Sequence, residues 1–104
     1  MLDFFKNLFS SNPKADLGEI IKSGAIIIDV RSKGEFQQNH LKGSISVPLK
    51  NIQEYLPKLK KDKPVIVCCA SGARSASARS IMQSNGFTQV YNGGSWMSLR
   101  KYKN

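Results

Sequence analysis

Residues 65–75 read VIVCCASGARS, an apolar run that ends in two cysteines and passes through small residues into a segment rich in serine and alanine. A continuous apolar run without alternation is typical of a strand buried on both faces of a parallel sheet. Ala70, Ser71, Gly72 and Ala73 have little side-chain bulk, so the backbone there can curl and direct successive N–H groups at an anion. The stretch therefore predicts a strand, an anion-binding loop and a helix, in that order.

Further strands are expected where other apolar runs occur. A second continuous run at 25–28 predicts another central strand, and the shorter runs at 44–47 and 88–91 predict flanking strands. Helical segments are expected between them, at 16–23, 32–39, 52–59 and about 75–85. Strands that alternate with helices predict an α/β fold, a three-layer α/β/α sandwich around a mostly parallel sheet of about four to five strands. Ligands usually bind beyond the carboxyl ends of such strands.

Two capping patterns support the expected helices, and one proline limits the third. Asp16 is placed to cap the first helix, and Ser32 and Glu35 have the spacing of a capping box at the start of the second. Pro57 lies inside the third helical pattern and is expected to kink or shorten that helix.

Residues 1–12 stand apart from the rest of the chain. At about 100° per residue, one helical face collects the large apolar side chains, namely Leu2, Phe4, Phe5, Leu8 and Phe9. This pattern predicts a short amphipathic helix with a linker, docked on its own domain, or alternatively on a partner, a second copy or a membrane surface. Residues 13–104 are expected to form one domain.

Length and charge limit the function classes. A chain of 104 residues has the size of one domain. No stretch approaches the roughly 18 apolar residues of a membrane-spanning helix, and the first residues lack a basic region, so neither an integral membrane segment nor a secretory signal is expected. The net charge of +9 favours anionic substrates or acidic partners. Most basic residues are lysines scattered along the chain with few interleaved aromatics, so nucleic acid is not an expected partner.

The two cysteines are adjacent, at Cys68 and Cys69. Neighbouring cysteines form only a strained disulfide, so a secreted disulfide framework is not indicated and a reducing cytoplasm is expected. Cys69 begins the small-residue loop, faces a helix N-terminus and has Arg74 at the far end of the loop, and both features favour the thiolate. Cys69 is therefore the candidate nucleophile, whereas Cys68 ends the buried run and is expected to behave as a small hydrophobe.

Residues 69–75 resemble the active-site loop Cys-x-x-Gly-x-Arg-Ser of the single-domain rhodanese-like (thiosulfate sulfurtransferase) family. Other segments resemble the upstream and closing motifs of that family, at 28–32, 35–36, 40–45, 47–49 and 91–94. The resemblance implies that Cys69 carries sulfur as a persulfide. It also implies that the backbone N–H groups of Ala70, Ser71, Gly72, Ala73 and Arg74 bind the anionic substrate.

The resemblance further implies a sulfurtransferase that moves sulfane sulfur from a small anionic donor such as thiosulfate to cyanide, a thiol or a protein acceptor. Asp29, Arg31 and Ser75 are expected to support the loop, Asp29 by hydrogen bonds and as a charge partner of Arg31. His40, the single histidine, is expected to tie loops together rather than act as a base. No cofactor is implied, and the Cys and His spacing does not fit a zinc site.

Other interpretations remain open from the sequence. Residues 68–74 also satisfy Cys-x5-Arg, the phosphate-binding loop of cysteine phosphatases, and some arsenate reductases share the fold. Starting the loop at Cys69 instead puts Gly72 in the expected place, which favours the sulfurtransferase. A third interpretation is a non-catalytic interaction module. Arg74 can pair with a carboxylate as readily as contact substrate, and the anion-facing role is the one expected here.

Overall fold

The computed structural model describes residues 16–103. Within them, four parallel strands form one sheet of order β2-β1-β3-β4. The strands are β1 (Ile26–Asp29), β2 (Ile45–Ser46), β3 (Val65–Cys69) and β4 (Val90–Ser95). The two central strands, β1 and β3, are those predicted from the continuous apolar runs, and every residue of β3 is buried.

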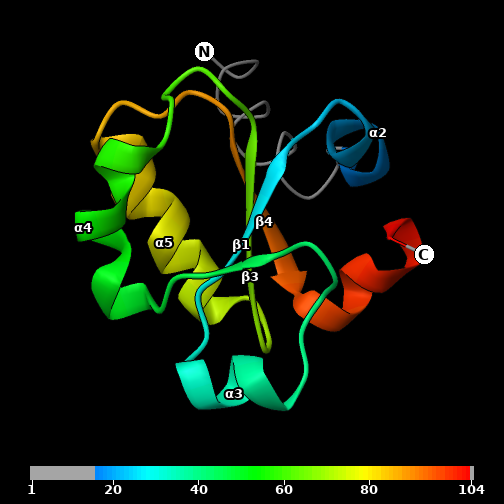
Figure 1. The fold of residues 1–104 in the computed structure, drawn as a ribbon. Helices are drawn as coiled ribbons and strands as arrows, with labels where there is room; N and C mark the ends of the chain where they lie inside the picture. The colour runs from blue at the N-terminus through cyan, green and yellow to red at the C-terminus, as the bar shows by residue number, and fades with distance from the viewer. Residues whose placement is uncertain (1–15, 104) are drawn as a thin grey trace, which may run out of the picture.

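Helices cover both faces of this sheet. The α-helices are α2 (Leu17–Lys22), α3 (Lys33–Gln38), α4 (Ile52–Tyr55) and α5 (Ala73–Ser84), and the 3-10 helices are η1 (Leu49–Asn51), η2 (Leu56–Lys58) and η3 (Trp96–Tyr102). With the sheet seen edge-on, α4 and α5 lie on one side and α2 and η3 on the other (Figure 1). The predicted three-layer α/β/α sandwich is confirmed.

The sheet separates two apolar clusters. One packs against α4 and α5 and contains Ile28, Val67, Cys69, Ala78 and Met82 among its buried residues. The other packs on the opposite face and contains Ile27, Ile66, Cys68, Trp96 and Leu99. Because successive side chains of a strand point to opposite faces, the two adjacent cysteines belong to different clusters.

The local signals at helix ends are confirmed. The Asp16 carboxylate accepts a hydrogen bond from the Glu19 N–H at 3.1 Å. Ser32 and Glu35 form the reciprocal capping box at the start of α3. The expected helix over 52–59 is divided into α4 and η2, and Pro57 lies in η2. Proline lacks an N–H and disrupts a regular helix, which is the reason for the division.

Two boundaries near the loop differ from the prediction. Strand β3 continues to Cys69, one residue beyond the predicted end, and α5 begins at Ala73 rather than about residue 75. The loop between them is therefore short, and both of its ends are anchored in regular structure.

The largest difference is in β4, which was expected at 88–91 and occupies Val90–Ser95. The pairing shifts between Val67, which faces Asn92, and Cys68, which faces Gly94, so Gly93 is an additional residue on β4. A Cβ atom on Gly93 would lie 2.8 Å from Cγ2 of Ile66, so only glycine fits there. The sequence Asn-Gly-Gly resembles a turn, but here it is an irregular strand segment.

The predicted N-terminal helix and linker lie outside the described residues, so that prediction remains untested. No helix within residues 16–103 combines the length and the apolar character needed to cross a membrane.

Candidate functional site

The candidate site lies at the carboxyl ends of the parallel strands. Cys69 is the last residue of β3, and the residue is 1% exposed. Gly72 precedes α5 with a φ of 110°, a left-handed conformation that side chains rarely adopt. This glycine lets the backbone turn back from the strand into the helix around the cysteine.

The sulfur atom of Cys69 is surrounded by hydrogen-bond donors. The Gly72 N–H donates to Sγ at 2.9 Å, and the Ser75 N–H donates at 3.4 Å. The Ser75 hydroxyl also lies 3.4 Å from Sγ. The structure thus brings together Cys69, Gly72 and Ser75, three of the residues singled out from the sequence, and their polar groups converge on the sulfur.

These donors change the acidity of Cys69. Burial alone would raise the pKa of its thiol. The hydroxyl and N–H of Ser75, together with the N–H groups of Gly72 and Ser71, stabilise the thiolate and lower the pKa to about 7. The lowered pKa thus favours the nucleophilic thiolate form of Cys69 near neutral pH.

Cys68 has the opposite environment. Its side chain is fully buried in the apolar cluster on the other face of the sheet. Burial, reinforced by the Asp29 carboxylate, raises the pKa of Cys68 to about 12. The prediction that Cys68 behaves as a buried hydrophobe agrees with this position.

Asn92 is a polar residue at the site that was not predicted from the sequence. Its Nδ2 group donates to the Gly72 carbonyl at 3.2 Å, and its Oδ1 atom lies 2.6 Å from the Ser75 hydroxyl. Asn92 therefore contacts both residues that donate to the sulfur. A polar residue directly before Gly93 was the available signal, but its place at the site depends on the continuation of β4 beyond its predicted end, which pairs Asn92 with Val67.

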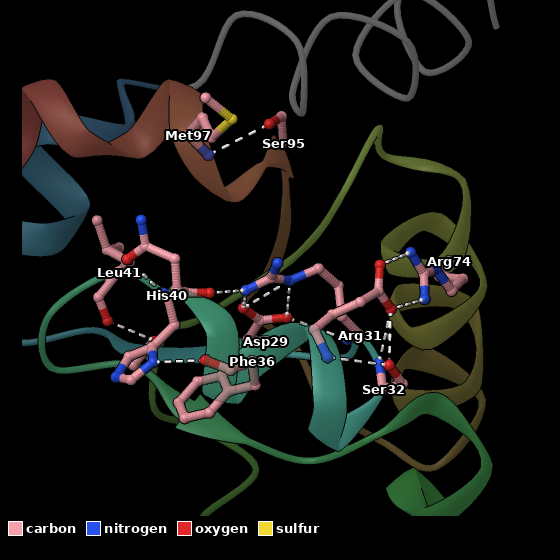
Figure 2. Close-up of polar contacts among 12 residues, drawn as sticks. Asp29, Arg31, Ser32, Phe36, His40, Leu41, Arg74, Ser95 and Met97 are labelled. Carbon is pink, nitrogen blue, oxygen red and sulfur yellow. Dashed lines mark hydrogen bonds and ion pairs between the residues drawn. The ribbon is translucent and has the colours of Figure 1, made fainter.

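Arg74 points toward α3. Its guanidinium donates to both carboxylate oxygens of Glu35, at 2.8 and 3.1 Å (Figure 2). Hydrogen bonds from Arg74, with further bonds from Ser32, lower the pKa of Glu35 to about 2. The carboxylate pairing considered from the sequence is thus present, and the expected contact of Arg74 with an anion remains a prediction. Ala70 and Ala73 are exposed, and their N–H groups stay candidate anion ligands.

A cleft of about 600 Å³ lies beside Arg74, in the first turn of α5. Arg74 lines one wall, Lys33 and Lys50 contribute two further cations, and Val30 and Leu49 supply apolar surface. The charge of this cleft suits an anionic molecule that approaches the loop from this side.

Asp29 and Arg31 form a buried ion pair beneath the site (Figure 2). Arg31 Nη2 lies 2.7 Å from Asp29 Oδ2 and also donates to the Asn39 carbonyl at 2.8 Å. The guanidinium lies 4.8 Å from the ring centre of Trp96, which extends the contact to η3. The pair thus connects β1, the end of α3 and η3, and its expected support of the cysteine loop remains a prediction.

His40 follows α3 and contacts that helix rather than the cysteine loop. Its Nδ1 atom lies 2.8 Å from the Phe36 carbonyl, and the two rings stack at 3.8 Å (Figure 2). A carbonyl only accepts, so Nδ1 carries the hydrogen in this contact. These contacts are structural. Within residues 16–103, no group of His, Cys, Asp or Glu side chains is arranged to hold a metal ion.

Comparison with known proteins identifies the family. Residues 13–98 match the model of the rhodanese-like domain. The thiosulfate sulfurtransferase GlpE of Pseudomonas savastanoi pv. phaseolicola (strain 1448A / Race 6) is 32% identical over 83 residues, which cover 80% of this chain and 78% of that protein. The thiosulfate sulfurtransferase PspE of Escherichia coli (strain K12) is 39% identical over 69 residues, which cover 64% of this chain and 66% of that protein.

A solved structure described as rhodanese with anions from E. coli superposes with a TM-score of 0.66 at 34% identity. The match covers 72% of this chain and 91% of that one. Sequence and fold therefore agree with the resemblance found in the loop, and this chain belongs to the rhodanese-like domain family.

Proposed function

We propose that this protein is a sulfurtransferase that moves sulfane sulfur from an anionic donor such as thiosulfate to cyanide or a thiol through a persulfide on Cys69. The observation that carries the proposal is the convergence of the Gly72 N–H and the Ser75 N–H and hydroxyl on the Cys69 sulfur. Such an arrangement stabilises negative charge on sulfur, which both the thiolate and the persulfide carry.

In the first step, the Cys69 thiolate attacks the outer sulfur of thiosulfate. The bond between the two sulfur atoms of thiosulfate breaks, its electron pair leaves with sulfite, and Cys69 keeps the outer sulfur as a persulfide anion. The N–H groups of residues 70–74 hold the donor anion, and the Arg74 guanidinium adds positive charge at the rim. In the second step, cyanide or a thiolate attacks the outer persulfide sulfur, which releases the product and restores the Cys69 thiolate.

The position of Cys68 argues against the phosphatase interpretation. A phosphate-binding loop from Cys68 to Arg74 would need the Cys68 thiolate inside the loop. The Cys68 side chain instead lies in the cluster on the opposite face of the sheet from Cys69, and its pKa is raised to about 12. The shorter loop beginning at Cys69 suits a sulfur-centred anion.

The relatives support the same reaction class. Two of them carry the name thiosulfate sulfurtransferase, and the E. coli rhodanese structure is described with anions. The cleft beside Arg74, which Lys33 and Lys50 also line, favours anionic sulfur donors such as thiosulfate.

Mass spectrometry after incubation with thiosulfate tests the proposal. Cys69 should gain about 32 Da, the mass of one sulfur atom, and a reducing agent should remove it. The wild-type protein should also form thiocyanate from thiosulfate and cyanide.

The two cysteines provide matched variants. Cys69→Ser should abolish both the adduct and thiocyanate formation, whereas Cys68→Ser should retain most of each. Activity that depends on Cys68 would refute the assigned loop. A protein whose Cys69 reacts with alkylating agents but accepts no sulfur from any donor would instead be a binding or relay module.

A further inference from the structure

The orientation of the Asn92 side-chain amide is fixed by two backbone groups. Its Nδ2 group donates to the Gly72 carbonyl at 3.2 Å, and its Oδ1 atom accepts from the Gly94 N–H at 2.9 Å. A peptide N–H only donates and a carbonyl only accepts, so these two contacts determine which end of the amide is oxygen. The oxygen therefore faces Ser75.

The Ser75 hydroxyl has one hydrogen and three acceptors within reach. Oδ1 of Asn92 is closest at 2.6 Å, the Gly72 carbonyl lies at 3.1 Å, and the Cys69 sulfur lies at 3.4 Å. An amide oxygen cannot donate, so the short contact with Asn92 requires that the hydroxyl hydrogen point at Oδ1. In that orientation the hydroxyl presents its lone pairs to Cys69 and can accept from the thiol S–H.

We propose that Asn92 is a positioning residue that controls the Ser75 hydroxyl, holding its hydrogen while Cys69 is a thiol and releasing it to the sulfur when Cys69 becomes negatively charged. The amide oxygen then competes with the thiolate for one hydrogen. This inference rests on the proposed function, because the negative charge leaves the Cys69 sulfur atom when the persulfide forms and returns to it when the acceptor removes the outer sulfur.

The other charged and titratable groups around the loop affect the pKa of Cys69 equally in all variants. Arg74 of α5 is paired with Glu35 of α3, Asp29 of β1 is paired with Arg31, and Cys68 of β3 has a raised pKa. In residues 16–103, none of these side chains hydrogen-bonds the Ser75 hydroxyl. A change at Asn92 therefore leaves their electrostatic contribution in place.

The proposal predicts opposite effects for two substitutions of similar shape. Asn92→Leu removes the competing oxygen, so the Ser75 hydrogen turns to the sulfur and the pKa of Cys69 should fall by about half to one pH unit. Asn92→Asp holds the hydroxyl hydrogen more strongly and adds a negative charge, so the pKa should rise by about one pH unit. The Gly72 carbonyl still accepts from the Ala76 N–H at 3.0 Å, which keeps the loop anchored in both variants.

The experiment measures the rate of alkylation by iodoacetamide against pH, in a Cys68→Ala background where Cys69 is the only thiol. The midpoint of each profile reports the pKa of Cys69. Asn85→Ala is the matched control, because Asn85 bonds Gln53 and the Ile81 carbonyl at the far end of α5. It should leave the midpoint unchanged. Alkylation needs only the thiolate, so the result does not depend on whether the protein transfers sulfur.

A double substitution tests whether Asn92 acts through Ser75. Ser75→Ala should raise the midpoint, and adding Asn92→Leu to Ser75→Ala should produce no further change. The proposal is overturned if Asn92→Leu raises the midpoint as Ser75→Ala does, which would mean that Asn92 only maintains the loop. It is also overturned if the effect of Asn92→Leu persists without Ser75, or if neither Asn92 variant moves the midpoint. Should Asn92→Leu fail to fold, Asn92→Ala takes its place, alone and combined with Ser75→Ala, because it also removes the amide oxygen and adds no charge.

Discussion

Replacing Gly72 by alanine tests whether the loop backbone sets the acidity of Cys69. The φ of Gly72 is 110°, so a Cβ atom there strains the turn and displaces an N–H that lies 2.9 Å from the sulfur. Strain of this kind costs about 1 to 2 kcal/mol in the folded state. We expect the backbone to rotate toward a negative φ, which moves the N–H away from Sγ.

The expected shift in the pKa of Cys69 follows from the number of donors that stabilise its thiolate. Several donors together lower the pKa of Cys69 from 9.0 to about 7. Losing one donor to a charged sulfur costs roughly 1.5 kcal/mol, which corresponds to about one pH unit. The thiolate fraction at pH 7 should fall from about one half to about one tenth, whereas at pH 9 both proteins should be almost fully ionised.

The thiolate absorbance in the far ultraviolet measures this fraction between about pH 5 and pH 9. The Cys69→Ser protein supplies the baseline, and Cys68 contributes little because its pKa is about 12. Urea unfolding of each variant separates lost stability from changed acidity. A folded Gly72→Ala protein whose midpoint stays near pH 7 would refute the view that the aimed N–H stabilises the thiolate.

Three further outcomes are expected. Asp29→Asn should lower the free energy of unfolding in urea by about 3 to 5 kcal/mol, because it leaves the Arg31 guanidinium buried without a counter-charge; a loss below about 1 kcal/mol would contradict this role. Glu35→Gln should release Arg74 from its ion pair and raise kcat/KM for thiosulfate about two- to tenfold. Arg74→Ala should lower kcat/KM about tenfold or more. If both variants changed kcat/KM in the same direction, the guanidinium would not contact the donor. Because the net charge is +9, kcat/KM for thiosulfate should fall as ionic strength rises through about 0.1 M, and a salt-independent rate would exclude long-range attraction of the donor.

The sequence was sufficient for the features that depend on local pattern. Continuous apolar runs marked β1 and β3, and the spacing of Ser32 and Glu35 marked the start of α3. The small residues between Cys69 and Arg74 marked the loop. Each of these signals comes from residues close together in the chain, where the period of burial or a cap has a direct physical cause.

The remaining site features depend on contacts between distant segments. Glu35 and Arg74 are 39 residues apart, and nothing local distinguishes Glu35 from other carboxylates as the partner of Arg74. Asn92 reaches the loop because β4 continues past its predicted end and pairs Asn92 with Val67, directly before the extra residue Gly93. A one-residue change of strand pairing decides which side chain faces the cysteine, and sequence pattern does not determine that register.

The opposite orientation of the adjacent cysteines has a consequence for oxidative damage. When a peroxide oxidises a reactive cysteine to sulfenic acid, a nearby second thiol can condense with it and prevent further oxidation. The chain contains two cysteines, and Cys68 is buried on the other face of the sheet from Cys69. Cys68 therefore cannot serve as the resolving thiol, and a sulfenic acid at Cys69 must be reduced by a thiol from another molecule before it becomes irreversibly oxidised.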